Sequence, residues 1–293
     1  ALETADDRSR SLILTVIGRR KIQNVEPILL PYLQHKNKRV QRNAWIAMGE
    51  TADPEYIPQI LDELLLLERS TAEASFVQNA VVKIISRAKN TGETIQFIVS
   101  GFHKAEHDKT KIILIQILGR IGNPDTYPLV AGTLQNDNPE LVLACIRSLS
   151  NWPNSAPVFD LINFVLHHDE QKLKILALRG IDKIIQADNA LSQHVKVPIY
   201  EFILDHAPTA QEKRMALSGL SHLLTPRSLE TVSTFFNESE VKEEAIVAAV
   251  SMLPEIWWQD QQLTSKVINS LLSITDNPDD VSKLKNIKIR LDE

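Results

Sequence analysis

The sequence predicts an all-α protein built from stacked helix pairs, and three observations carry this prediction. One pattern of apolar and small residues recurs along most of the chain about every 33 residues, a period typical of helical repeat arrays. Glycine is scarce, with 9 among 293 residues, whereas sheet architectures need glycine in many tight turns. No stretch of useful length alternates apolar and polar residues as a strand does.

The repeated pattern has an apolar residue at position i, small residues at i+4 and often i+7, and an aliphatic residue at i+8. On an α-helix these positions form one buried stripe, and its small residues let a neighbouring helix approach closely. The spacing between copies varies and is longest, at 39 residues, between Leu173 and Glu212. We expect such variation because insertions fall in the loops between helices. The copies start at Ser9, Val40, Phe76, Thr110, Leu141, Leu173, Glu212 and Val241.

A second amphipathic segment lies between the copies and completes each pair. Proline often introduces it, which fits the first turn of a helix, where the missing N–H costs nothing. These prolines are Pro54, Pro124, Pro153 and Pro226. Polar turns then lead into the next copy, and three of their residues are expected to be N-caps: Asn37, Asn138 and Ser239.

The predicted array is one solenoid over residues 1–293, with about seven to eight helix pairs. Residues 8–20 read as a partial N-terminal repeat whose first helix is missing, and residues 276–293 as a polar cap helix. We therefore expect the chain to be part of a larger protein.

Several stretches resemble HEAT repeats, a family of armadillo-like helix pairs, and two are similar to bacterial HEAT arrays in particular. The resemblance covers about residues 8 to 275 and departs at Gln41 and Val142, where the family usually has Arg or Lys. It implies a right-handed α-superhelix that presents a concave surface to another macromolecule. The stretches are Val40–Gly49, Lys111–Gly122 and Val241–Val250, with 177–180 and 212–220 as the bacterial-type ones.

Positions i+2 and i+6 of the second helices project opposite their buried stripe, and in HEAT-like arrays this side lines the concavity. Here it alternates Arg with aliphatic residues, so we expect it to bind a protein or peptide that carries carboxylates and apolar anchors. The alternative is that the aliphatic side chains contact adjacent repeats and the Arg stems cover them. The candidate partner-binding residues are Arg42, Trp45, Ile112, Leu143, Arg147, Ile175, Arg179 and Arg214.

Nucleic acid is the alternative partner. Residues 1–50 contain nine basic and five acidic residues, although the whole chain has a net charge of −5. A basic end could bind a phosphate backbone. Arrays that wrap duplex DNA need basic residues along many repeats, so we prefer a protein partner.

No motif predicts an enzyme, a cofactor or a metal site. The single cysteine, Cys145, occupies a stripe position where other copies have alanine, so we expect a small buried side chain. His103 and His107 are four residues apart but fall in a predicted turn. No apolar run approaches the ~18 residues that cross a bilayer, so we expect a soluble protein, cytoplasmic or exported after leader removal.

Overall fold

A computed structural model describes residues 2–65, 71–88 and 91–292. Within these residues the regular elements are α-helices and short 3₁₀ turns, with no strand, so the prediction of an all-α fold is confirmed. The chain divides into two compact units, Ala1–Trp152 and Pro153–Glu293. A single solenoid over the whole chain stays a prediction.

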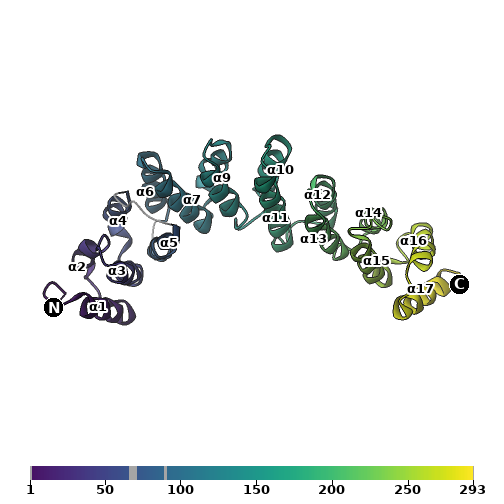
Figure 1. Cartoon of the computed structure of the whole chain (residues 1–293), viewed down its shortest axis with the longest axis horizontal. Coiled ribbons are helices and arrows are strands. Elements are labelled where there is room, and N and C mark those ends of the chain that lie inside the picture. Colours follow the sequence, from purple (N-terminus) through teal and green to yellow (C-terminus); the bar gives the residue numbers. More distant parts are fainter. Residues whose placement is uncertain (1, 66–70, 89–90, 293) are drawn as a thin grey trace. The chain divides into compact units, whose positions relative to one another are not determined.

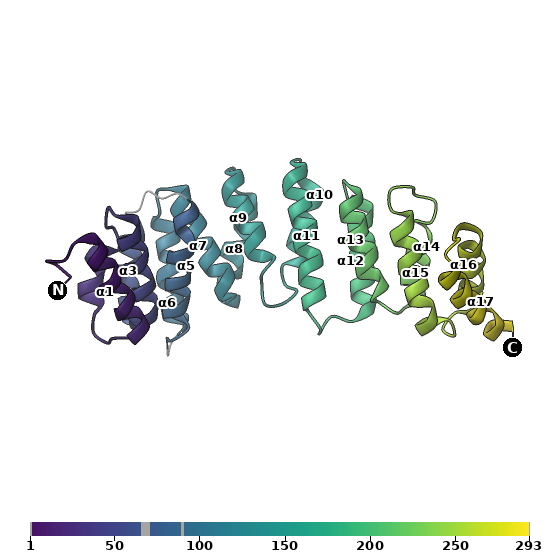
Figure 2. The ribbon, with the colours of Figure 1, turned by 60° about the horizontal axis from the view of Figure 1, so that its bottom comes forward.

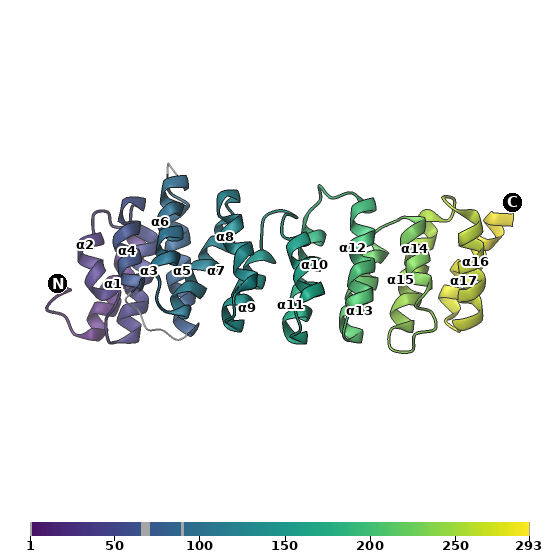
Figure 3. The same cartoon turned by 90° about the horizontal axis from the view of Figure 1, so that it is seen from above.

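Each unit has two layers of helices, which Figures 1, 2 and 3 show from three directions. We call the first helix of each pair an A helix and the second a B helix. In unit 1 the A helices are α2 (Glu26–Leu29), α4 (Ile57–Leu65), α6 (Thr91–Lys104) and α8 (Tyr127–Gly132). Its B helices are α1 (Asp7–Arg20), α3 (Lys38–Thr51), α5 (Thr71–Ile85), α7 (Asp108–Ile121) and α9 (Pro139–Leu149).

Unit 2 continues the same alternation of A and B helices. Its A helices are α10 (Val158–His167), α12 (Gln193–His206), α14 (Pro226–Ser233) and α16 (Gln261–Ile274). Its B helices are α11 (Gln171–Ala187), α13 (Ala210–Ser221), α15 (Lys242–Ile256) and α17 (Pro278–Asp292). The expected partial repeat at residues 8–20 is α1, and the expected cap helix is α17, which packs against α15 and α16.

Two of the three expected N-caps are present. The side chain of Asn37 accepts the backbone N–H of Arg39 and Val40 at the start of α3, and Asn138 caps α9 in the same way. The prediction for Ser239 is wrong. A further turn, in which Val241 donates its N–H to the carbonyl of Glu238, follows first, so α15 begins only at Lys242.

Small residues bring the backbones of neighbouring B helices together in unit 1. A Cβ added at Gly49 of α3 would lie 2.7 Å from the Cα of Ala80 on α5. A Cβ added at Gly119 of α7 would lie 2.4 Å from the Cβ of Ser148 on α9. Ala80 and Ser148 are small residues of the stripe, and each meets a glycine that directly follows the stripe of the preceding copy. A side chain larger than hydrogen at either glycine would push the two helices apart.

We predict that Gly119→Ala lowers the free energy of unfolding by about 1–3 kcal/mol, because the added methyl group overlaps Ser148. The matched control is Gly132→Ala at the end of α8, where an added Cβ meets nothing within 4 Å. That change should be neutral or raise stability by about 0.5 kcal/mol, since alanine favours a helix more than glycine does. Urea denaturation followed by circular dichroism measures both, and equal effects would contradict the proposed close approach.

Candidate functional site

The eight predicted partner-binding residues all lie on B helices, and the structure separates them by exposure. Arg42 and Arg147 in unit 1 are exposed, as are Arg179 and Arg214 in unit 2. Leu143 and Ile175 are half-buried. Trp45 and Ile112 are buried.

The predictions for Trp45 and Ile112 are wrong, because both side chains belong to the core of unit 1. The indole of Trp45 has no exposed surface, and its N–H donates to the carbonyl of Leu33, which follows α2, at 3.1 Å. Ile112 lies on α7, which packs against α5, α6, α8 and α9. A helix with neighbours on four sides leaves few positions for a partner.

Three of the four exposed arginines contact the next B helix of the same unit. In unit 1 the guanidinium of Arg42 on α3 stacks over the ring of Phe76 on α5, with its Cζ 4.2 Å from the ring centroid. A stacked guanidinium at this distance makes a cation–π interaction. The contact fits the alternative interpretation, in which the strip joins adjacent repeats.

In unit 2 Arg179 joins α11 to α13 through a buried carboxylate. Its Nε and Nη2 lie 2.9 and 2.6 Å from one oxygen of Glu212, which is completely buried, and Nη2 also donates to Gln211. The hydroxyl of Thr209 donates to the other oxygen of Glu212. Arg179 and Thr209 therefore donate hydrogen bonds to both oxygens of the buried Glu212 carboxylate, as a buried charge requires.

Arg214 makes the corresponding connection from α13 to α15, but at the surface. Its Nε lies 2.7 Å from Glu244, and its Nη2 donates to the carbonyl of Glu240. Both side chains of the ion pair are about half exposed, at 49% and 40%. Water competes for such a pair, so we expect it to contribute little stability.

Arg147 differs from the other three arginines. It lies on α9, the last B helix of unit 1, and its guanidinium makes no hydrogen bond or ion pair with the described residues. All its donors are therefore available to a carboxylate from outside the chain.

Charge is segregated between the two layers of unit 1. The B helices α1, α3, α5, α7 and α9 contain twelve basic and five acidic residues, whereas α2, α4, α6 and α8 contain four acidic and one basic. The basic residues thus extend along the B helices well beyond residue 50. The average over the whole chain hides this pattern, because basic and acidic helices alternate in the sequence.

A pocket of about 440 Å³ opens between α1 and α3 on this basic layer. Its neighbourhood favours a carboxylate: a hydrogen bond from Lys83 lowers the pKa of Glu50, and the charges of Lys83, Lys21 and Arg87 lower it further. The apolar side chain of Ile46 on α3 lines this pocket and is exposed, and Leu12 on α1 is exposed as well. The pocket is lined by Thr15, Gly18, Arg19, Lys21, Asn43, Ile46 and Glu50.

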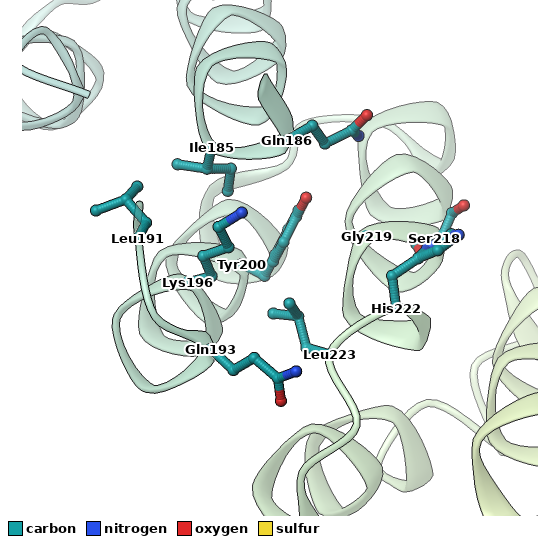
Figure 4. A pocket seen from close by; sticks show the side chains of 10 residues that line it. All are labelled: Ile185, Gln186, Leu191, Gln193, Lys196, Tyr200, Ser218, Gly219, His222 and Leu223. Atoms are coloured by element: carbon teal, nitrogen blue, oxygen red, sulfur yellow. The ribbon is translucent and has the colours of Figure 1, made fainter. Parts of the chain in front are cut away.

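A second pocket, of about 420 Å³, lies in unit 2 between α11, α12 and α13. Figure 4 shows Lys196 and Tyr200 extending side by side from α12, with Gly219 and His222 on the α13 side. Our reading of the sequence missed this pocket. The available signal was the longest repeat spacing, from Leu173 to Glu212, which spans these residues.

A buried polar cluster supports the wall of this second pocket. Asp182 accepts hydrogen bonds from Gln186, at 2.8 Å, and from the hydroxyl of Tyr200. Burial raises the pKa of Asp182, and the two hydrogen bonds partly oppose this. Burial, followed by the charge of Asp182, raises the pKa of Tyr200. The Tyr200 ring lies so close to α13 that a Cβ at Gly219 would be 2.2 Å from it.

We predict that Arg179→Ala lowers the free energy of unfolding by about 2 kcal/mol, because it leaves the buried Glu212 carboxylate with fewer partners. Arg214→Ala, which removes a half-exposed pair on the next helix, should cost less than about 1 kcal/mol. Urea denaturation of both variants tests the comparison. If Arg214→Ala lowers the free energy of unfolding more than Arg179→Ala does, the burial of Glu212 does not determine how much each arginine contributes to stability.

We predict that Asp182→Asn stabilises the protein increasingly as pH rises. Because the folded-state pKa lies above the ordinary value of 3.8, the unfolded chain loses its proton first, so stability falls as pH rises from 3.8 to the raised pKa and is constant above it. Asparagine avoids this cost and can still accept both hydrogen bonds. Asp188→Asn should show the opposite trend, because hydrogen bonds from Ser155 and Ala190 lower the Asp188 pKa. Unfolding free energies at about pH 2, 4 and 7 measure both effects, because the Asp188 effect falls below about pH 4 and the Asp182 effect above about pH 4. Equal pH dependence of the two variants would contradict the assignment.

Of the other candidate residues, Cys145 and His107 lie where the sequence analysis predicts, whereas the prediction that His103 lies in a turn between helices is wrong. Cys145 is completely buried, as predicted, with its thiol 2.9 Å from the carbonyl of Val130. His103 lies in the last turn of α6 and His107 precedes α7. Among the described residues, no three side chains of His, Cys, Asp or Glu gather as a metal site would require. No helix in the described ranges combines the length and the apolar character that a membrane span needs.

Comparisons with known proteins support the class that the fold defines. A family model of HEAT repeats matches residues 1–79. No curated protein sequence matches the chain. One similar solved structure, titled "Computational Design of Self-Assembling Cyclic Protein Homooligomers", is 12% identical and covers 98% of this chain and 94% of its own. Its TM-score is 0.15, which is too low to support a conclusion about the fold or function of this chain.

The prediction of a HEAT-repeat protein is therefore confirmed. The family model supports it over residues 1–79, and the alternating helix pairs support it over the rest of the described chain. HEAT repeats generally serve as scaffolds for protein interactions.

Proposed function

We propose that this protein is a non-enzymatic scaffold that binds an acidic protein or peptide through the B helices of unit 1. The observation that carries the proposal is a basic helix layer that also exposes the aliphatic side chains Leu12 and Ile46. Acidic side chains would pair with the arginines, and apolar ones would cover the aliphatic residues.

The arginines of the predicted strip differ in how they can contribute. Arg147 has a free guanidinium. Arg19, which is not part of the predicted strip, lines the pocket between α1 and α3 and adds a basic side chain to this surface. Arg42 is exposed but stacks on Phe76. In unit 2, Arg179 and Arg214 already bind carboxylates of this chain, so neither they nor Ile175 belong to the surface that we propose for unit 1. The half-buried Leu143 on α9 has a smaller role in that surface.

A nucleic acid is the competing partner, because the basic residues continue along α7 and α9. Phosphate contacts alone would not need exposed aliphatic side chains, whereas a peptide with apolar anchors would. The exposed Leu12 and Ile46 therefore favour a protein.

We predict that a fluorescent peptide of alternating Glu and Leu binds the chain, and that Arg147→Glu or Arg19→Glu weakens binding about tenfold. Fluorescence anisotropy at low salt measures the affinity, and added salt should weaken it. Neither arginine supports the fold through a side-chain bond to a described residue, so both variants should fold normally.

The matched control is Lys104→Glu, which reverses an exposed charge on the A helix α6 and should leave peptide affinity unchanged. A DNA duplex is titrated in parallel. Peptide affinity that is insensitive to Arg147 and Arg19 would overturn the proposed surface. Tighter binding of the duplex than of the peptide would favour the nucleic-acid alternative.

A further inference from the structure

We propose that the pocket between α11, α12 and α13 binds a small organic acid, a carboxylate attached to an apolar body. This site is separate from the basic surface of unit 1 and lies wholly within unit 2. Its volume of about 420 Å³ falls in the range of small-molecule sites.

An irregular repeat builds the pocket. The repeat that starts at Leu173 is the longest of the array, and α11 runs to Ala187 before a loop returns to the start of α12 at Gln193. Leu191 of that loop forms part of the pocket wall. Insertions in helical repeats map to loops that often belong to a binding face.

Tyr200 keeps the pocket open on its inner side. Its ring lies against Gly219 of α13, and its hydroxyl is held by the buried Asp182. Gly219 therefore faces an A helix, α12, whereas Gly119 of unit 1 meets a B helix, α9. An aromatic ring held from two sides gives a wall that needs no rearrangement when a ligand enters.

The polar groups of the pocket select an anion. Lys196 is half-buried, and its ammonium group has no hydrogen-bond or ion-pair partner among the described residues. Lys196 and Tyr200 are four residues apart on α12, and both side chains line the pocket (Figure 4). Gln193 lies at the rim, in the first turn of α12, where the helix dipole also favours negative charge. A carboxylate would therefore find the Lys196 ammonium group in the pocket.

The remaining lining provides the apolar contacts. Ile185 and Leu191 lie on the side of α11 and its loop, and Leu223 follows α13. The Nδ1 atom of His222 lies 2.8 Å from the carbonyl oxygen of Ser218, and this contact fixes the orientation of the imidazole ring. The Nε2 atom is therefore the ring nitrogen that is available to a ligand. Three aliphatic side chains and the Tyr200 ring, set among polar ones, fit an acid with a short hydrocarbon or aromatic body.

Isothermal titration calorimetry with 3-phenylpropanoate, benzoate and hexanoate tests the proposal on the full chain. We expect saturable one-site binding of at least one acid, and no binding of its neutral amide. Lys196→Gln should weaken binding about tenfold, because it removes the charge at nearly constant length. Gln193→Glu should weaken it by a similar factor, because it adds a negative charge at the rim.

The matched control is Lys266→Gln on α16, an exposed lysine of the same unit that does not line the pocket. It should bind the acid as the unchanged protein does. Gln193→Glu places an acidic residue in the first turn of a helix, where it is tolerated, so the test does not depend on Lys196→Gln folding normally. Failure of all three acids to bind, or equal affinities in the Lys196 and Lys266 variants, would overturn the proposal.

Discussion

The close approach of neighbouring B helices is the constraint on which the rest of unit 1 depends. Gly49 lies against Ala80, and Gly119 against Ser148, so successive backbones almost touch. At that separation, long side chains on one helix reach the next. The contact between Arg42 and Phe76 and the ion pair between Lys83 and Glu50 are consequences of this spacing. One feature of the sequence, the small residues of the stripe, therefore sets both the fold and the use of surface charge.

The same constraint decides which charges remain for a partner. Three arginines of the predicted strip, Arg42, Arg179 and Arg214, contact the next B helix of their unit, and Arg179 does so through the buried Glu212. Burying that carboxylate without the guanidinium would leave it short of hydrogen bonds, so this arginine stabilises the repeat. Arg147 lies on the last B helix of unit 1 and keeps its guanidinium free. The proposed binding surface thus consists of side chains that the packing between helices leaves exposed.

Unit 2 shows how one irregular repeat adds a feature that regular ones lack. The Tyr200 ring lies directly against Gly219 of α13. The connection from the end of α11 to the start of α12 belongs to the longest repeat of the array. Asp182 is retained at this point although its burial disfavours the charged form. Its hydrogen bonds to Gln186 and Tyr200 fix the ring in place. A buried polar cluster beside an open pocket is the arrangement that most sets this unit apart from a plain stack of helices.

The helical pairs, their order and the capping by Asn37 and Asn138 follow from the sequence, because each depends on residues within one or two turns of one another. The all-α array and the burial of Cys145 could be predicted for the same reason. The burial of Trp45, the pairing of Arg179 and the pocket around Tyr200 could not. Each depends on how many helices surround a position and how close they come, and these distances join residues that are far apart in the chain.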